Sequence, residues 1–157
     1  MKITFLVVGK TSEPWAIQAI QEYEHRLKHY FSFQTVVIQT PKSASKFTPD
    51  QLKQYEAEQI LSFLKPGEKM VLLDEKGSMH TSEDFAQYVQ KKLNAGIRNL
   101  IFVVGGPFGF APSVYEACDE RISLSKMTLT HQMVRVLFIE QLYRAGTILR
   151  NESYHHS

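Results

Sequence analysis

The last residues of the sequence combine an aromatic side chain with two imidazoles, because Tyr154 is followed by His155 and His156. An aromatic ring can stack on a nucleic-acid base, and an imidazole titrates near neutral pH and can move a proton or hold a metal. Chain ends are often disordered, however, and composition alone favours a solvated tail here. The sequence thus leaves two interpretations, a chemically active segment and a solvated end.

Charged residues recur four positions apart in the apolar segment before this tail. His131 and Arg135 share one face of the helix expected there, and Glu140 and Arg144 share the opposite face. An arginine on a largely buried helix needs a carboxylate or a phosphate partner. Arg144 can therefore pair with Glu140 or bind an anionic ligand. The segment is so apolar that it must be buried on most sides, and a subunit interface could cover part of it.

Two further segments could hold a ligand through their backbones. Gly105–Gly109 directly follows the most apolar predicted strand, and its glycines permit positive φ and a close approach of the backbone. Its spacing matches neither Gly-x-Gly-x-x-Gly nor a Gly-Lys-Ser/Thr phosphate loop, which disfavours a plain dinucleotide or triphosphate site. Leu124–Leu129 leaves a short strand without glycine or proline and could wrap around a ligand. The structural alternative for Gly105–Gly109 is a tight turn. For Leu124–Leu129 it is an ordinary connection between a strand and a helix.

Alternating strand and helix patterns must position these residues. Strands are predicted at Ile3–Val8, Phe33–Gln39, Met70–Leu73, Asn99–Val104 and Arg121–Leu124, and helices at 14–29, 48–64, 82–95, 112–118 and 130–150. Thr48 and Gln51 are expected to form a capping box, and Ser82 is expected to cap the third helix. Asp74–Gly77 is expected to be a turn and Thr40–Phe47 a basic, flexible loop.

This alternation indicates an α/β fold in which helices cover both faces of a parallel sheet. Ligands on such sheets bind at the carboxyl ends of the strands. Those ends are at Gly9, Asp74, Gly105 and the segment after Leu124. We therefore expect a ligand site along this edge of the sheet.

Length and composition limit the class of protein. The 157 residues fit one domain, 1–157, that can fold without a disulfide or a structural metal. The single cysteine, Cys118, excludes a disulfide framework and a cysteine-rich zinc site, and catalysis by it is disfavoured. No signal peptide is evident, and no apolar run reaches the ~18 residues of a membrane span. We expect a soluble, cytoplasmic protein, whose formal charge of +2 neither demands nor excludes a nucleic-acid partner.

Several motifs occur in order along the chain: Val103–Gly109 (VVGGPFG), Leu124–Val136 (LSKMTLTHQMVRV), Glu140–Ala145 (EQLYRA) and the terminal Tyr154-His155. Together with the start of the chain, they resemble the ribosomal RNA large subunit methyltransferase H family of the SPOUT class. The resemblance covers essentially the whole chain. The combination is highly specific, although no single motif would be.

The resemblance implies an activity and a fold. The family transfers a methyl group from S-adenosylmethionine, without a metal, to N3 of pseudouridine 1915 in helix 69 of 23S rRNA within the assembled 70S ribosome. It also implies a homodimer, and an α/β/α sandwich with a C-terminal trefoil knot. The sequence pattern alone does not predict the knot, because unknotted connections are by far the most common. The implied cofactor site comprises Leu73, Gly105, Leu124, Ser125, Lys126, Met127, Thr128 and Leu129.

The resemblance also implies roles for residues near the end of the chain. Arg144, Tyr154 and His155 match positions for substrate binding or catalysis, and His131 and Arg135 are expected to bind substrate near them. His155 is a candidate general base, and Arg144 could hold a phosphate or stabilise an oxyanion. One departure is visible, because a histidine follows His155 where the family carries Lys or Arg.

Two other functions stay open at this point. A SPOUT enzyme could act on another RNA, such as tRNA, but no additional RNA-binding domain is evident. A ribosome-binding module without catalysis is the second alternative. The intact cofactor segment and the intact Tyr154-His155 tail argue against it.

Overall fold

Five parallel strands form one sheet in the order β2-β1-β4-β3-β5. The computed structural model describes residues 1–156, and its strands are β1 (Lys2–Val8), β2 (Ser32–Ile38), β3 (Lys69–Met79), β4 (Asn99–Val104) and β5 (Glu120–Ser123). β1 and β4 lie side by side inside the sheet and are buried almost throughout, which explains their continuous apolar sequences. The prediction of a parallel α/β sheet is confirmed.

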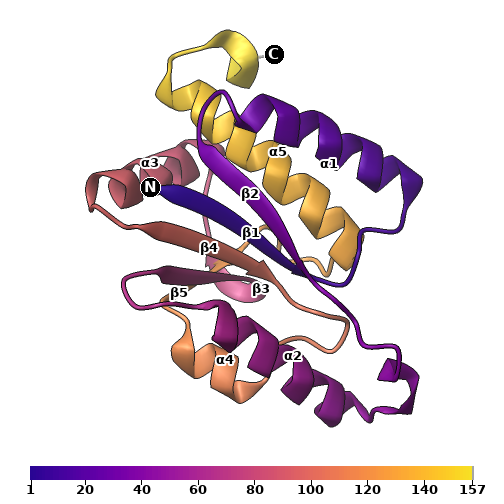
Figure 1. Cartoon of the computed structure of the whole chain (residues 1–157). Helices are drawn as coiled ribbons and strands as arrows, with labels where there is room; N and C mark the ends of the chain where they lie inside the picture. The colour runs from indigo at the N-terminus through magenta and orange to yellow at the C-terminus, as the bar shows by residue number, and fades with distance from the viewer. Residues whose placement is uncertain (157) are drawn as a thin grey trace.

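Helices cover both faces of this sheet (Figure 1). α1 (Pro14–Leu27), α3 (Ser82–Asn94) and α5 (His131–Leu149) pack on one face, and α2 (Pro49–Phe63) and α4 (Pro112–Ala117) pack on the other. Two short 3₁₀ helices, η1 (Ala44–Lys46) and η2 (Ser153–His156), follow β2 and α5. No helix within residues 1–156 is both long and apolar enough to cross a membrane.

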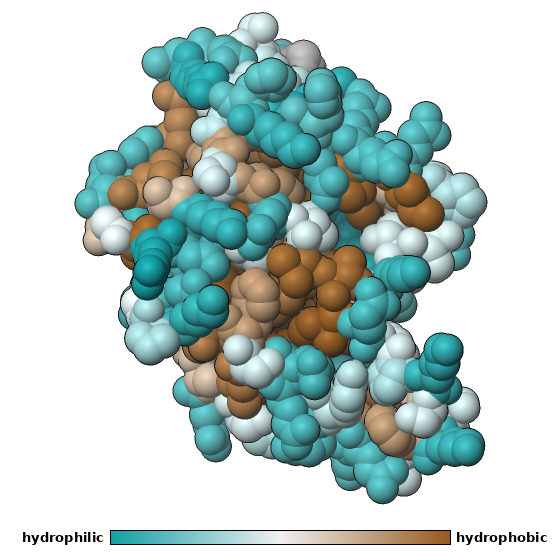
Figure 2. Space-filling view, in the orientation of Figure 1, coloured by the Kyte–Doolittle hydropathy of each residue, from teal (hydrophilic) through white to brown (hydrophobic). Residues whose placement is uncertain are grey.

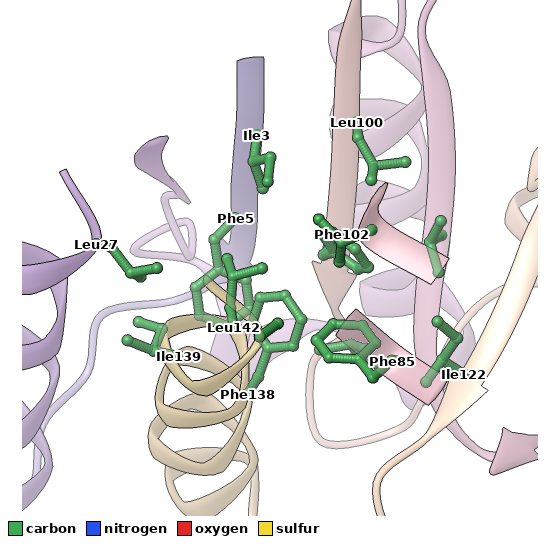
Figure 3. Close-up of a cluster of buried hydrophobic side chains, with 14 of the residues drawn as sticks. Ile3, Phe5, Leu27, Phe85, Leu100, Phe102, Ile122, Phe138, Ile139 and Leu142 are labelled. Atoms are coloured by element: carbon green, nitrogen blue, oxygen red, sulfur yellow. The ribbon is translucent and has the colours of Figure 1, made fainter. Parts of the chain in front are cut away.

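The larger hydrophobic core fixes α5 over the sheet. The ring centroid of Phe138 on α5 lies 4.8 Å from that of Phe5 on β1 and 4.7 Å from that of Phe102 on β4 (Figure 3). A smaller core on the opposite face contains Ile60 of α2 and Val114 of α4. Burying aromatic and aliphatic side chains of this size contributes about 1.5–3 kcal/mol each. This packing anchors the middle of α5 on the sheet and thereby sets the positions of both ends of the helix.

The segment Asp74–Gly77 is not the predicted turn but an interruption within β3. Leu73 and Ser78 both pair with Ile122 of β5, so the residues between them bulge out of the ladder. A Cβ atom on Gly77 would lie 2.6 Å from the backbone of Arg121, and only glycine allows this approach. The prediction was wrong because the polar sequence resembles a turn, whereas pairing with β5 continues the strand.

Other local predictions have mixed outcomes. The capping box is confirmed, because Gln51 N–H donates to Thr48 Oγ1 at 3.2 Å and Thr48 N–H donates to Gln51 Oε1 at 3.0 Å. The cap of α3 is Thr81 rather than Ser82, since Thr81 Oγ1 accepts from the N–H of Asp84. Ser82 instead donates to Gln141 on α5 at 2.8 Å, which joins the two helices.

The chain crosses from the sheet edge to a helical layer after β5. β5 is the edge strand beside β3, whereas α5 packs on the sheet face that also carries α1 and α3. The connection 124–130 makes this crossing next to the bulge of β3. The trefoil knot concerns how this connection threads, and it stays a prediction.

Candidate active site

A cavity of about 590 Å³ opens at the carboxyl ends of β3, β4 and β5. It is lined by the bulge of β3, the glycine loop and the connection into α5. The predicted cofactor residues Leu73, Gly105, Leu124, Ser125, Met127 and Leu129 line it, as does His131, whereas Lys126 and Thr128 are not among its walls. The volume suits a small-molecule site, and its position is the one expected for a parallel sheet.

The glycine loop forms one wall of this cavity. Gly109 N–H donates to the carbonyl of Gly106 at 3.1 Å, and its φ of +78° closes the loop as a tight turn. Gly105 lies against the ring of Phe110, where a Cβ atom would meet the ring at 3.0 Å. Gly109 thus provides the positive φ of the turn, and Gly105 leaves the space that the ring of Phe110 occupies. The loop therefore presents its backbone to the cavity.

Side-chain hydrogen bonds give the connection into α5 a defined path. Ser123 Oγ donates to the carbonyl of Ser125 at 2.7 Å, and Ser125 Oγ accepts from the N–H of Met127 at 2.9 Å. Thr128 Oγ1 donates to Glu75 Oε2 at 3.0 Å. This last bond links the connection to the bulge of β3, so these two walls of the cavity stabilise each other.

Asp74 and Tyr115 add a polar wall to the cavity. The hydroxyl of Tyr115 donates to Asp74 Oδ2, and Asp74 Oδ1 accepts from the N–H of Lys76 at 2.8 Å. Burial and the Asp74 carboxylate together raise the pKa of Tyr115 to about 12, so the phenol stays protonated. Sequence reasoning placed Asp74 at a strand end but missed Tyr115, because 41 residues separate the two.

His131 and Arg135 have different surroundings despite sharing a helix face. His131 lines the cavity, and burial together with the charge of Arg135 lowers its pKa, which favours the neutral imidazole. Arg135 is only 1% exposed and donates to the carbonyls of Val8 (2.7 Å) and Gly9 (3.0 Å) and to Thr11 Oγ1 (3.1 Å). In this structure Arg135 thus holds the loop after β1 instead of facing a ligand.

The tail is ordered and packs against α5, unlike the solvated end that composition favoured. Tyr154 lies edge-on to the ring of Tyr143 at 4.7 Å, and its hydroxyl donates to Glu140 Oε1 at 2.9 Å. Burial, followed by hydrogen bonds with Tyr23 and Glu140, raises the pKa of Tyr154. The phenol is therefore held protonated beside α5.

Arg144 and His155 complete a cluster of polar side chains around the tail. Arg144 donates to Glu140 Oε1 from Nε (3.2 Å) and Nη2 (2.7 Å), which confirms an ion pair between these residues. Its Nη1 atom lies 3.3 Å from Nδ1 of His155. On the other side of the ring, Nε2 of His155 lies 2.8 Å from Oε1 of Glu83 on α3. The sequence carried no signal for Glu83, which is 72 residues away from His155.

One chain does not bring this tail cluster to the cavity. Val134 borders the cavity and Arg144 holds the cluster, and ten residues of α5 separate them. At a rise of 1.5 Å per residue this is about 15 Å along the helix. Figure 1 likewise shows η2 at the end of α5 that lies away from the connection into it. The predicted cofactor and catalytic residues thus form two separate groups within one chain.

Within residues 1–156, no group of three or more His, Cys, Asp or Glu side chains could hold a metal ion. His25 and His29 lie edge to face with ring centroids 5.9 Å apart on α1 and remain a pair.

Comparisons with known proteins identify the family of this chain. A family model described as "Predicted SPOUT methyltransferase" matches residues 1–155. The chain is 51% identical over 156 residues to "Ribosomal RNA large subunit methyltransferase H" of Parabacteroides distasonis, with 99% of each chain covered. Proteins with the same name from Porphyromonas gingivalis and Bacteroides fragilis are 50% and 48% identical, again over 99% of each chain. The chain therefore belongs to the SPOUT methyltransferase family.

Proposed function

We propose that this protein methylates N3 of pseudouridine 1915 in helix 69 of 23S rRNA, with S-adenosylmethionine as methyl donor and the assembled 70S ribosome as substrate. The observation that carries the proposal is the cavity, because one pocket is lined by both motif segments that the resemblance assigned to the cofactor. The names of relatives at about 50% identity support rRNA as the substrate class.

The residues around the cavity fit S-adenosylmethionine. Backbone from Gly105 and Leu124–Leu129 can contact an adenosine, while Leu73 and Phe110 supply apolar walls. Asp74 and Glu75 in the cavity lining supply carboxylates that favour a cationic sulfonium. When bound, this cofactor supplies an activated methyl group. The chain must then align that methyl group with the base and remove one imide proton.

The tail cluster has the groups for this second task. His155 can accept the N3 proton as a general base, which typically contributes about 10²–10⁴-fold to a rate. Arg144 can stabilise the negative charge that develops on the base, because its Nη1 atom points to His155 at 3.3 Å while Nε and Nη2 bind Glu140. Tyr154 holds the tail to Glu140. His131, which lines the cavity, can contact the RNA, and Arg135 would act indirectly through the loop after β1 that it holds.

The working enzyme is then a homodimer in which the tail of one copy approaches the cavity of the other. The distance of about 15 Å along α5 within one chain supports this arrangement. Large apolar side chains are exposed on α1 and α5, among them Trp15 (46%), Met133 (37%) and Leu137 (37%). Figure 2 shows brown surface between teal side chains where Figure 1 draws these helices. A second copy would cover this surface and complete the site.

Methyl transfer from labelled S-adenosylmethionine to 70S ribosomes, free 50S subunits and tRNA tests the proposal. We expect incorporation into 70S ribosomes at the helix 69 pseudouridine. His155→Ala should slow single-turnover transfer by ~100-fold with unchanged cofactor affinity, whereas His156→Ala, next to it in the tail, should retain most of the rate.

Other outcomes would overturn specific parts of the proposal. Incorporation into tRNA alone would reassign the substrate. Binding to ribosomes with no affinity for S-adenosylmethionine in calorimetry would indicate a module without catalysis. Equal single-turnover rates for His155→Ala and the unmodified protein would remove His155 as the base.

A further inference from the structure

His155 is held at both nitrogens of its ring. Nε2 lies 2.8 Å from Oε1 of Glu83, and Nδ1 lies 3.3 Å from Nη1 of Arg144. The side chain of His155 is 20% exposed, so the ring is largely enclosed by its neighbours. An imidazole contacted at both nitrogens has its orientation set by those contacts.

The two partners also decide which nitrogen carries the proton. A guanidinium has only N–H donors, so the Nδ1 atom facing Arg144 must offer a lone pair. An ionised carboxylate has only acceptors, so the Nε2 atom facing Glu83 must carry the hydrogen. The hydrogen bond from His155 lowers the pKa of Glu83, which keeps that carboxylate ionised. The neutral imidazole is therefore the Nε2–H form.

We propose that Glu83 is a positioning residue for proton transfer, which holds His155 as the Nε2–H form so that Nδ1 is the atom that takes the proton from the substrate base. This inference rests on the proposed function, in which His155 is the general base. It adds a residue on α3 to a site otherwise built from α5 and the tail.

The proton balance of this step follows from the contacts. The N3–H bond of the base breaks and a bond from hydrogen to Nδ1 forms, while the electron pair stays on N3. That pair would form the new bond to the methyl carbon as the carbon–sulfur bond breaks, with its electrons left on sulfur as a neutral thioether. The imidazolium charge is then opposite Glu83. A protonated Nδ1 can no longer accept from Arg144, so Nη1 is released while Nε and Nη2 stay on Glu140. Arg144 thus becomes available for the developing oxyanion when it is needed.

Glu83 can be changed without loss of the fold. Its side chain is 63% exposed, and an exposed ion pair of this kind contributes little to stability. The start of α3 is held independently by the Thr81 cap and by the bond from Ser82 to Gln141. An effect of Glu83 on the reaction would therefore not come from unfolding.

Glu83→Ala and Glu83→Gln, with Asp84→Ala as the matched control, test the inference. Asp84 is an exposed carboxylate in the same turn of α3, so its removal changes the local charge equally. ¹H–¹⁵N NMR of the imidazoles, assigned with His155→Gln, should show a hydrogen-bonded Nε2–H signal for His155. The signal should be lost in Glu83→Ala, kept in Asp84→Ala and kept in Glu83→Gln, whose amide oxygen can still accept.

Single-turnover methyl transfer provides the second readout. Glu83→Ala should be slower by ~10-fold at unchanged cofactor affinity, Glu83→Gln should recover part of the rate, and Asp84→Ala should match the unmodified protein. An unchanged Nε2–H signal in Glu83→Ala, or an unchanged rate despite a lost signal, would overturn the inference. A chain that methylates no RNA would overturn the proposed function instead, whatever the NMR signal shows.

Discussion

Glu56 is a buried carboxyl group behind the wall of the cavity. It lies on α2 with 6% of its surface exposed, and burial raises its pKa above the ordinary value of 4.5. A Cβ atom on Gly106 would meet Glu56 Oε1 at 2.5 Å, so the carboxyl group occupies the space that glycine leaves open behind the loop. Ionising such a group in an apolar surrounding costs free energy that the folded chain must supply.

Replacing Glu56 with Gln should therefore stabilise the protein in a pH-dependent way. The pKa of Glu56 is raised in the folded state, so its carboxyl group costs no stability at a pH where it is protonated in both the folded and the unfolded protein. The loss of stability grows as the pH rises from 4.5 through the folded-state pKa. Urea unfolding should show little difference at about pH 4 and a gain of about 1 kcal/mol at about pH 7. Glu58→Gln, at an exposed position of the same helix, is the control. A gain that is equal at both pH values would contradict this account.

The sequence predicted side-chain contacts only between residues that are close along the chain. The spacing of Glu140 and Arg144 predicts their ion pair, because four residues bring two side chains together on a helix. Glu83, Tyr115 and Glu56 gave no such signal, since each meets its partner from a different element. The fold decides these contacts, and spacing along the chain cannot reveal them.

At the scale of elements, the bulge of β3 differs most from the sequence-based expectation. The periodicity of apolar residues predicted the five strands and five α-helices within two residues at each end, except that β3 continues to Met79 instead of ending at Leu73. Asp74–Gly77 was missed because its polar composition is typical of a turn, whereas the backbone of β5 pairs on both sides of it. Composition alone likewise favoured a solvated tail, yet Tyr154 and His155 contact side chains of α5 and α3. Both differences arise where long-range contacts override local composition.

Gly77→Ala tests whether this bulge supports the cavity. The new Cβ atom would lie 2.6–2.7 Å from backbone atoms of Arg121 and Ile122, which cannot move aside as a flexible side chain could. We expect a loss of about 3 kcal/mol in the free energy of unfolding, measured in urea, and weaker binding of S-adenosylmethionine in calorimetry.

Gly67→Ala provides the comparison for this change. Gly67 has a φ of +83° but no atom within 4 Å of the Cβ position, so alanine there adds backbone strain without a clash. A cost of about 1 kcal/mol and unchanged cofactor binding are expected. Equal losses of cofactor affinity in the two variants would show that the close approach of Gly77 to β5 is not what shapes the cavity.

At the scale of the whole molecule, one chain has a weak electrostatic hold on RNA. Its formal charge is +2, whereas affinity for a phosphate backbone grows with each basic contact. Two copies would double the basic surface, cover the exposed apolar side chains of α1 and α5, and join a cavity to a tail cluster. The same arrangement would explain why the proposed cofactor and catalytic residues lie apart within one chain.

Mixing two inactive variants would reveal such a shared site. Leu129→Trp should fill the cavity, and His155→Ala should remove the base from the tail. In a mixed dimer, one site would combine both defects and the other would combine an intact cavity with an intact tail. Unfolding and remixing equal amounts should then restore about a quarter of the unmodified activity, because half of the dimers are mixed and each has one working site. If each chain used its own tail, every site would keep one defect and the mixture would stay inactive at every ratio.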